Sequence, residues 1–221
     1  MRKVIGAAFV SLDGVMQAPG GPEEDRSGGF ELGGWLFEYF DESAGKWIDA
    51  LFSGDFDLLL GRRTYDIFAA YWPFVDGDEA ALGARFDRAA KYVLTRGEQP
   101  LDWQNSHRLP GIEALAEVKR GDGPALIVQG SSTLYPQLLA AGLIDRLVLM
   151  TFPLVLGGGK RLFDDSTLPR SMRMVDHEVS ASGAVFAAYE PGGPVEPGSF
   201  PTMEPTEAEL ERRAKVAAGT W

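Results

Sequence analysis

The amino-acid sequence predicts an α/β protein with a central mixed, mostly parallel sheet and an antiparallel edge. Short apolar segments alternate with longer segments of helical periodicity, which is the pattern of parallel strands covered by helices on both faces. The last two apolar segments, residues 172–179 and 184–189, follow one another across only residues 180–183. Such a short connection is typical of an antiparallel pair.

The composition is that of a globular protein. Hydrophobic residues make up 45% of the 221-residue chain and charged residues 24%, which are ordinary values. The formal net charge of -11 disfavours nucleic acid as a partner, because an acidic surface repels phosphate backbones at long range. The absence of cysteine excludes disulfides, thiolate catalysis and thiolate metal ligands. We therefore expect no metal centre and a cytoplasmic location.

The first ten residues combine a basic start with an apolar run, as a secretory signal also does. The run stops at Ser11-Leu12-Asp13-Gly14, too early for a signal core or a membrane span. We expect residues 3–12 to form a buried strand, and we expect no membrane partner.

A long segment rich in Gly, Pro and acidic residues follows this strand. Residues 13–34 are longer than most connections in a compact domain, and such loops are often lids, so we expect a mobile loop here. From Trp35 to about Phe52 apolar residues recur at helical spacing, and Gly54 is a suitable stop. One helix is expected over that range.

The remaining elements follow from the same patterns. They are strand 57–61, helix 62–71, helix 79–90, strand 91–95, helix 112–119, strand 125–128, a helix that follows Gly130-Ser131-Ser132 and ends near residue 141, strand 145–153, glycine loop 156–160 and the final strand pair. After Pro191 the chain becomes rich in Gly and Pro, and residues 206–218 follow as a charged helix capped by Thr206. The sequence thus divides into a domain of residues 1–190 and a spacer with a helical tail, residues 191–221.

One strand end carries residues suited to a phosphate-bearing ligand. Strand 57–61 runs into a helix through Gly61, Arg62, Arg63 and Thr64. A helix N-terminus offers free N–H groups, and arginines offer charge-assisted hydrogen bonds to phosphate. A capped helix with solvated arginines explains the same residues equally well.

Two further strand ends have a similar character. Strand 125–128 ends in Gln129-Gly130-Ser131-Ser132-Thr133, where a glycine allows close approach and hydroxyls can donate to a diphosphate. Alone, a plain strand–turn–helix with a serine cap is favoured for this segment, which lacks the full GxGxxG pattern. Thr95 and Arg96 end strand 91–95 and can hold a ribose phosphate or simply begin a polar loop. Since ligands collect outside the carboxyl ends of strands, the three ends together are more specific than any one.

The order of these segments resembles a known family. The segments similar to the RibD C-terminal reductase domain family are Ser-Leu-Asp-Gly (11–14), Leu-Gly-Arg-Arg-Thr-Tyr (60–65), Tyr-Val-Leu-Thr-Arg (92–96), Ile-Val-Gln-Gly-Ser-Ser-Thr-Leu (127–134) and, most distinctive, residues 143–163. The resemblance covers residues 3–190. It implies the dihydrofolate-reductase-like fold, a three-layer α/β/α arrangement.

The resemblance also implies a reductase that uses NADPH on a small heterocyclic substrate, usually 5-amino-6-(5-phosphoribosylamino)uracil of riboflavin biosynthesis. The cofactor-binding residues that it implies are Gly61, Arg62, Arg63, Thr64, Thr95, Arg96, Gly130, Ser131, Ser132 and Thr133. The riboflavin enzymes typically carry a Glu and further glycines where this chain has Gln129-Gly130-Ser131-Ser132. A dihydrofolate- or pterin-type reductase and a non-catalytic NADP(H)-binding module are therefore alternatives. Related domains commonly pair, so we expect a homodimer.

The resemblance places Asp13 near the nicotinamide, as the catalytic candidate. Its carboxylate would orient the carboxamide or relay a proton, whereas closing an Asx turn is the alternative role. Glu38, Asp41 and Glu42 are further candidate proton donors, although a solvated helix face explains them as well. The expected substrate-binding residues are Trp35, Gly158 and Lys160.

Overall fold

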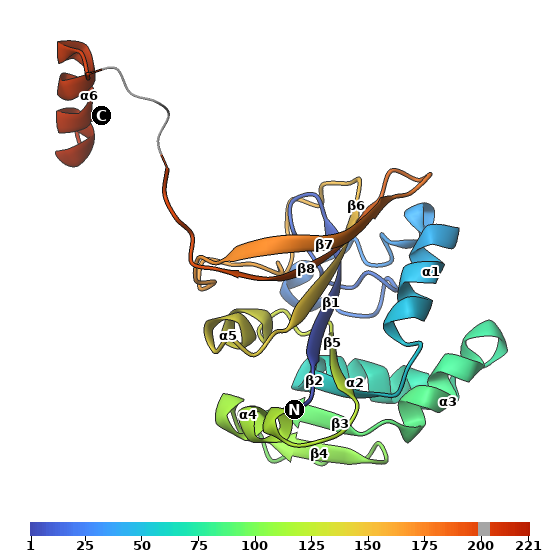
Figure 1. Cartoon of the computed structure of the whole chain (residues 1–221). Coiled ribbons are helices and arrows are strands. Elements are labelled where there is room, and N and C mark those ends of the chain that lie inside the picture. The colour runs from blue at the N-terminus through green and yellow to red at the C-terminus, as the bar shows by residue number, and fades with distance from the viewer. Residues whose placement is uncertain (199–203) are drawn as a thin grey trace.

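The computed structural model describes residues 1–198 and 204–221 (Figure 1). Within them the chain forms an eight-stranded sheet in the order β4-β3-β2-β5-β1-β6-β8-β7. The strands are β1 (Val4–Ser11), β2 (Phe56–Gly61), β3 (Lys91–Leu94), β4 (Ser106–Leu109), β5 (Ala125–Gln129), β6 (Arg146–Phe152), β7 (Ser171–Val179) and β8 (Val185–Gly193). The α-helices are α1 (Glu42–Leu51), α2 (Arg62–Tyr71), α3 (Ala80–Arg88), α4 (Ile112–Arg120), α5 (Tyr135–Ala140) and α6 (Glu207–Ala217). Short 3-10 helices span Ser27–Gly29, Phe37–Tyr39, Trp72–Phe74 and Gly77–Glu79.

The strand pairing confirms the predicted sheet. All neighbours from β4 to β6 in the sheet order pair in parallel, and β8 and β7 close the sheet as an antiparallel edge. The sequence pattern misses β4, because only Leu109 of its four residues is buried. An exposed edge strand of this kind lacks the apolar run by which strands are recognised.

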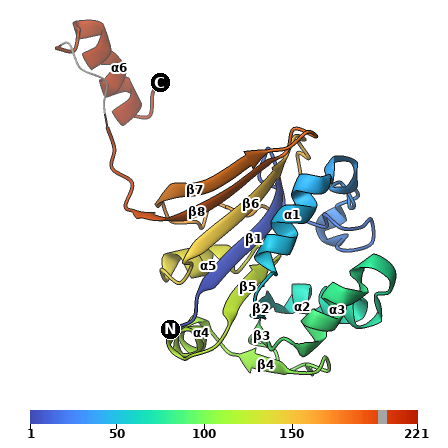
Figure 2. The same cartoon turned by 45° about the vertical axis from the view of Figure 1, so that its right-hand side comes forward.

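Helices cover both faces of the sheet, which gives three layers (Figures 1 and 2). On one face, Leu115 of α4 and Tyr135 of α5 pack in a core with residues of β1, β2, β5 and β6. On the other face, Phe52 after α1, Tyr65 of α2 and Phe86 of α3 pack against β2, β3 and β5. This arrangement leaves the carboxyl ends of the parallel strands at one edge of the sheet.

The expected single helix from Trp35 to Phe52 is wrong at its start. Trp35 lies in a turn, and α1 begins only at Glu42. Asp41 is the cause, because its backbone is extended and its carboxylate accepts the N–H of Ala44 at 3.1 Å. An aspartate in that position caps a helix and fixes where it starts.

The segment 13–34, expected to be mobile, is anchored at its beginning. Val15 pairs with Arg161 in an antiparallel bridge, and Met16 N donates to Lys160 O at 2.8 Å. The buried Gln17 fixes the rest, because its Nε2 donates to the carbonyls of Asp25 (3.0 Å) and Ser27 (2.9 Å). The base of this loop is therefore part of the core.

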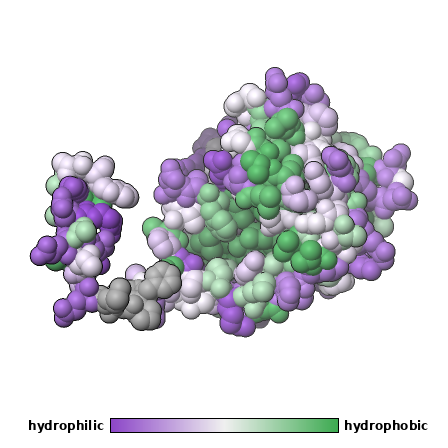
Figure 3. All heavy atoms as spheres, turned by 90° about the horizontal axis from the view of Figure 1, so that it is seen from above, coloured by the Kyte–Doolittle hydropathy of each residue, from purple (hydrophilic) through white to green (hydrophobic). Residues whose placement is uncertain are grey.

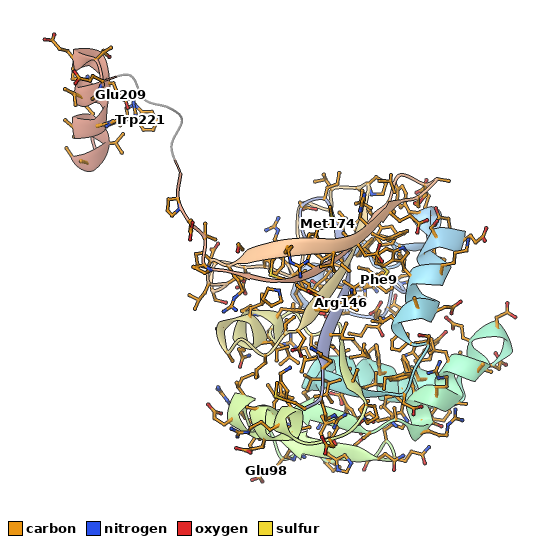
Figure 4. The ribbon with its side chains drawn as sticks, viewed as in Figure 1. Phe9, Glu98, Arg146, Met174, Glu209 and Trp221 are labelled. Atoms are coloured by element: carbon orange, nitrogen blue, oxygen red, sulfur yellow. The ribbon has the colours of Figure 1, made fainter. Side chains whose placement is uncertain are left out.

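The segment after residue 190 starts as the end of a strand and continues as a tail. The last strand, expected to end at residue 189, continues to Gly193. Thr206 caps α6 as expected, accepting the N–H of Glu209, and no residue of α6 is buried. In Figure 4 the labelled Glu209 and Trp221 lie on this tail, apart from the sheet, and Figure 3 shows its mostly hydrophilic surface. The division into residues 1–190 and 191–221 stays a prediction.

A buried ion pair ties the amino-terminal ends of the strands together. The Arg2 side chain, 4% exposed, pairs with Asp57, which is 13% exposed. Arg2 also donates to Pro124 O at 2.8 Å and to the Tyr92 hydroxyl at 3.1 Å, while Asp57 accepts Ala90 N at 2.9 Å. The pair therefore connects the starts of β1, β2, β3 and β5.

Replacing Arg2 by Met should destabilise the protein by about 3–5 kcal/mol, because the substitution leaves the Asp57 carboxylate buried without a counter-charge. Urea unfolding measures this cost. The matched control is Lys46→Met, which removes an exposed pair with Glu42 and should cost less than about 1 kcal/mol. Equal effects of the two substitutions would contradict the structural role given to Arg2.

Candidate functional site

A cleft of about 1680 Å³ opens along the carboxyl ends of the parallel strands. It runs past the ends of β1, β2, β3 and β5, as expected where parallel strands end together. Every residue that the sequence nominated for the cofactor lines this cleft: Gly61, Arg62, Arg63, Thr64, Thr95, Arg96, Gly130, Ser131, Ser132 and Thr133. The fold thus brings three separate segments of the sequence to one place.

The hydroxyl of Ser131 joins two of these strand ends. It accepts the N–H of Gly61 at 2.7 Å and donates to Thr64 Oγ1 at 2.8 Å. The two segments are so close that a Cβ on Gly130 would lie 2.9 Å from Thr64, and a Cβ on Gly61 would lie 3.0 Å from Ser131 Oγ. At Gly130 this contact and the positive φ together favour glycine, and at Gly61 a Cβ would force Ser131 to shift.

The helix expected after Gly130-Ser131-Ser132 is α5, which begins at Tyr135. Gly130 and Ser131 both have a positive φ, at 67° and 65°, which sends the chain into a turn before the helix. That conformation costs a serine about 1–3 kcal/mol, and such strain is often kept where it serves a binding site. The two hydrogen bonds of its hydroxyl hold Ser131 in this conformation.

The arginines at the cleft differ in how much of their charge is free. Arg62 Nε donates to both carboxylate oxygens of Asp66 (2.9 and 3.0 Å), and this bond raises the pKa of Arg62. Its Nη1 donates to the carbonyls of Gln99 and Pro100. Arg63 and Arg96 are exposed and form no salt bridge within residues 1–198 and 204–221. They supply the positive charge available to an anionic ligand.

We call the part of the cleft lined by the three strand-end segments the polar arm, and the part lined mainly by apolar side chains the apolar arm. Its apolar lining consists of Phe9, Ile48, Phe52, Phe68, Trp72 and Phe86, with neighbouring residues of the same segments. Phe9 of β1, labelled in Figure 4, packs against Phe152 and lies with Ile48 in the same core. This arm suits a flat, largely uncharged ring system.

Sequence reasoning missed the carboxyl groups that line the cleft, among them Asp49 and Glu24. Asp49 lies on the face of α1 that lines the cleft, together with Gly45, Ile48 and Phe52. The spacing of these four residues is that of one helix face, and it could have identified Asp49. Glu24 also lines the cleft, and burial raises its pKa, while it accepts Gly20 N at 2.7 Å.

The candidate acids that the sequence did nominate on the early helix lie outside the cleft lining. Asp41 caps α1, and its second oxygen accepts Ser182 N at 3.2 Å. Glu42 pairs with Lys46 at 2.8 Å, and Glu38 is exposed in a short 3-10 helix. Glu38 and Glu42 therefore match the solvated alternative, whereas Asp41 has a structural role as the cap of α1.

Asp13 is likewise outside the cleft lining and serves as an anchor. Its carboxylate accepts Ser11 Oγ at 2.6 Å, Leu156 N at 3.0 Å and Gly157 N at 2.9 Å. The Ser11 hydrogen bond, with those from the two backbone groups, lowers the pKa of Asp13 to about 2. Such a group is ionised at neutral pH. Its backbone partners lie in the distant segment at residues 156 and 157, while Val15 N donates to Ser11 Oγ, so Asp13 anchors two segments rather than closing an Asx turn. Its catalytic role stays an untested prediction.

The three expected substrate-binding residues lie in different places. Trp35 is buried beside Phe152, and its Nε1 donates to Gln17 O at 2.8 Å, away from the cleft lining. Gly158 lines a smaller neighbouring hollow of about 450 Å³. Lys160 lines both hollows, but it already pairs with Asp25 and donates to Ser27 Oγ at 2.7 Å.

Two further features are absent from residues 1–198 and 204–221. No three His, Cys, Asp or Glu side chains there come together as metal ligands. None of the helices in that part is both long and apolar enough to cross a membrane.

The sheet order, the antiparallel edge and the cleft at the strand ends define a dihydrofolate-reductase-like α/β protein. Within that class, the chain belongs to the RibD C-terminal domain family, whose model matches residues 2–186. It is 30% identical over 139 residues to the uncharacterized protein YyaP of Bacillus subtilis (strain 168), covering 62% of this chain and 74% of YyaP.

Solved structures share this fold. A protein from Shewanella sp. PV-4, whose name assigns it to riboflavin biosynthesis, matches with a TM-score of 0.59 and 18% identity, over 86% of this chain and 98% of that one. Dihydrofolate reductase from Enterococcus faecalis, complexed with NADP(H) and RAB-propyl, matches with a TM-score of 0.54 and 14% identity, over 86% and 96%. At these identities the likeness establishes the fold alone.

Replacing Asp13 by Asn should destabilise the protein by about 1–2 kcal/mol at neutral pH, because the pKa of about 2 lies below the ordinary 3.8. A depressed pKa contributes stability above the unfolded-state pKa. The difference between the two proteins should therefore be full above about pH 4 and shrink as the pH falls toward about 2. Urea unfolding at a series of pH values measures it. A loss of turnover of ~100-fold with unchanged stability would instead support a catalytic Asp13.

Proposed function

We propose that the protein is an NADPH-dependent reductase of a small heterocyclic substrate, resembling 5-amino-6-(5-phosphoribosylamino)uracil reductase. The observation that carries this proposal is the meeting of three glycine-, hydroxyl- and arginine-bearing strand ends in one cleft with an apolar arm. Membership of the RibD C-terminal domain family supports the reaction class. The complex of the Enterococcus faecalis enzyme with NADP(H) supports the cofactor.

The residues present fit a dinucleotide at the polar arm. The turn after β5, where Gly130 has a positive φ, brings its backbone and the hydroxyls of Ser132 and Thr133 to the cleft lining, where they would donate to a diphosphate. Arg63 and Arg96 would neutralise phosphate charge, because neither is committed to a carboxylate in the described chain. NADPH, when bound, supplies the hydride, while the protein orients the two ligands.

The apolar arm would hold the substrate and exclude water from it. Glu24 is a candidate proton source, because its carboxyl group lines the cleft and burial raises its pKa. Asp49 is another carboxyl that a bound heterocycle would meet in this arm. Asp13 would act from outside, by holding the glycine loop at Leu156 and Gly157 in place.

A non-catalytic NADP(H)-binding module is the second candidate, favoured by the anchoring of Asp13, the nominated acid. Steady-state oxidation of NADPH in the presence of pterin, flavin-precursor and quinone-like compounds separates the two. Binding without oxidation of NADPH by any of them would support the module. A dihydrofolate- or pterin-type reductase would show itself by its preferred acceptor.

Homodimerisation and a cytoplasmic location are further parts of the proposal. We expect light scattering at micromolar concentration to give the mass of a dimer, because related domains commonly pair. A monomeric mass under those conditions would contradict it.

NADPH should bind more tightly than NADH, and Arg96→Ala should weaken NADPH binding by about 1–3 kcal/mol while leaving NADH unchanged. Arg96 is a cleaner probe than Arg62, because removing Arg62 also breaks its bonds to Asp66 and to two carbonyls. Calorimetric titration measures both affinities. The control is Arg88→Ala, an exposed arginine outside the cleft lining. Equal affinity of the wild-type protein for both cofactors would remove the case for a 2′-phosphate site.

A further inference from the structure

One buried side-chain atom stands out in the part of the chain that the structure describes. Oε1 of Gln129 is the only buried side-chain nitrogen or oxygen there without a hydrogen-bond partner. Folded proteins leave few such atoms, because a buried acceptor without a donor loses its hydrogen bonds to water and gains none. Gln129 ends β5 and lines the cleft, which makes a molecule bound in the cleft a candidate source of the missing donor.

The register of the sheet places Gln129 at the floor of the apolar arm. Alternate residues of a strand share a face, and Ile127 packs with Phe52 in the core under α1 and α2, so Gln129 faces the same side. Its partner in the neighbouring strand is Ala7, whose short side chain leaves room beside the carboxamide. Ala7 itself packs near Leu51 of α1 on that face.

The side chain of Gln129 is uncharged, and it lies in a cleft of mixed character. Phe9 and Ile48 add apolar side chains to the lining, Lys160 is already paired with Asp25, and Asp49 and Glu24 add carboxyl groups, so selection for an uncharged ring edge is assigned to the carboxamide itself. A carboxamide carries a donor and an acceptor side by side, so it matches a ligand edge with an acceptor and a donor at the same spacing. The ring N–H next to a ring carbonyl, as in a lactam, is such an edge. Two parallel hydrogen bonds of this kind discriminate strongly between ring edges, as glutamine does when it reads adenine.

We propose that Gln129 is a specificity-determining residue that binds the lactam edge of the substrate heterocycle through two hydrogen bonds from its carboxamide. The inference rests on the proposed function only in taking the occupant of the apolar arm to be the substrate. A glutamate at this position would present two acceptors and a negative charge. It would repel the carbonyl of a lactam and favour an amidine edge, which carries only donors when protonated.

The test compares two heterocycles of the same size on NADPH-saturated protein. Lumazine presents lactam edges, and 2,4-diaminopteridine presents an amidine edge. Gln129→Met should weaken lumazine binding by about tenfold or more, the scale of a lost hydrogen-bond pair. Gln129→Glu should also weaken lumazine by about tenfold while strengthening 2,4-diaminopteridine by a similar factor. Quenching of tryptophan fluorescence is a suitable readout, because Trp72 lines the cleft.

The control substitution is Gln104→Met, at an exposed glutamine outside the cleft lining, which should change neither affinity. Thermal melting shows whether each variant is folded. If Gln129→Met does not fold, the nearly isosteric Gln129→Glu decides the test. NADPH affinity measured on the same proteins should stay within about threefold of wild type.

Three results would overturn the proposal. One is the absence of lumazine binding to the wild-type protein at millimolar concentration. Another is a parallel change of both heterocycles in Gln129→Glu. The third is a loss of NADPH affinity in Gln129→Met, which would assign the carboxamide to the nicotinamide instead. Failure of wild-type protein to bind NADPH would contradict the proposed function, but the lumazine measurements repeated without cofactor still decide the role of Gln129.

Discussion

The hydrogen bonds of the Ser131 hydroxyl are the interaction on which the candidate site depends. They join the end of β2, through the N–H of Gly61, to the start of α2, through Thr64, and they do so from the end of β5. The geometry requires small residues where the segments touch and a serine in a left-handed conformation. The strain of that residue and the absence of two side chains are thus parts of one arrangement. Without the bridge, the turn after β5 would keep the hydrogen bond from Leu134 N to Ser131 O but would lose its links to β2 and α2.

A second constraint acts at the opposite ends of the same strands. The buried pair of Arg2 and Asp57 fixes the amino-terminal ends of the parallel strands, where no ligand is expected. The parallel strands are therefore held at both ends by polar contacts, with an apolar core between them. This division agrees with a general feature of α/β sheets, in which stability and ligand binding are served by opposite edges.

Much of the fold follows from local patterns, and the failures have physical causes. Buried strands such as β2 and β5 are continuous apolar runs, so they are visible in the sequence. The strand β4 is mostly exposed and carries no such run. The starts of α1 and α5 depend on the capping carboxylate of Asp41 and on the turn at Gly130, which apolar periodicity does not report.

Some residues of the candidate site could be predicted from the sequence and others could not. Residues that follow buried strands could be predicted to lie together, because the carboxyl ends of parallel strands meet at one edge of the sheet. Asp49 and Glu24 were missed because their importance comes from what the fold brings opposite them. The position of Asp13 at a strand end did identify a residue with strong contacts, but its partners are the backbone groups of a distant loop. Only the tertiary structure reveals that those groups already satisfy the carboxylate.

The polar and apolar arms form one continuous cleft, and this continuity has an energetic consequence. Two ligands that lie in adjoining arms would cover part of each other's surface, so each removes water from the other's binding face. Their binding free energies are then coupled, and linkage requires the coupling to be reciprocal. If the nucleotide raises the affinity for the heterocycle by some factor, the heterocycle raises the affinity for the nucleotide by the same factor. If both ligands bind as proposed, the shape of the cleft would make the affinity for each depend on the presence of the other.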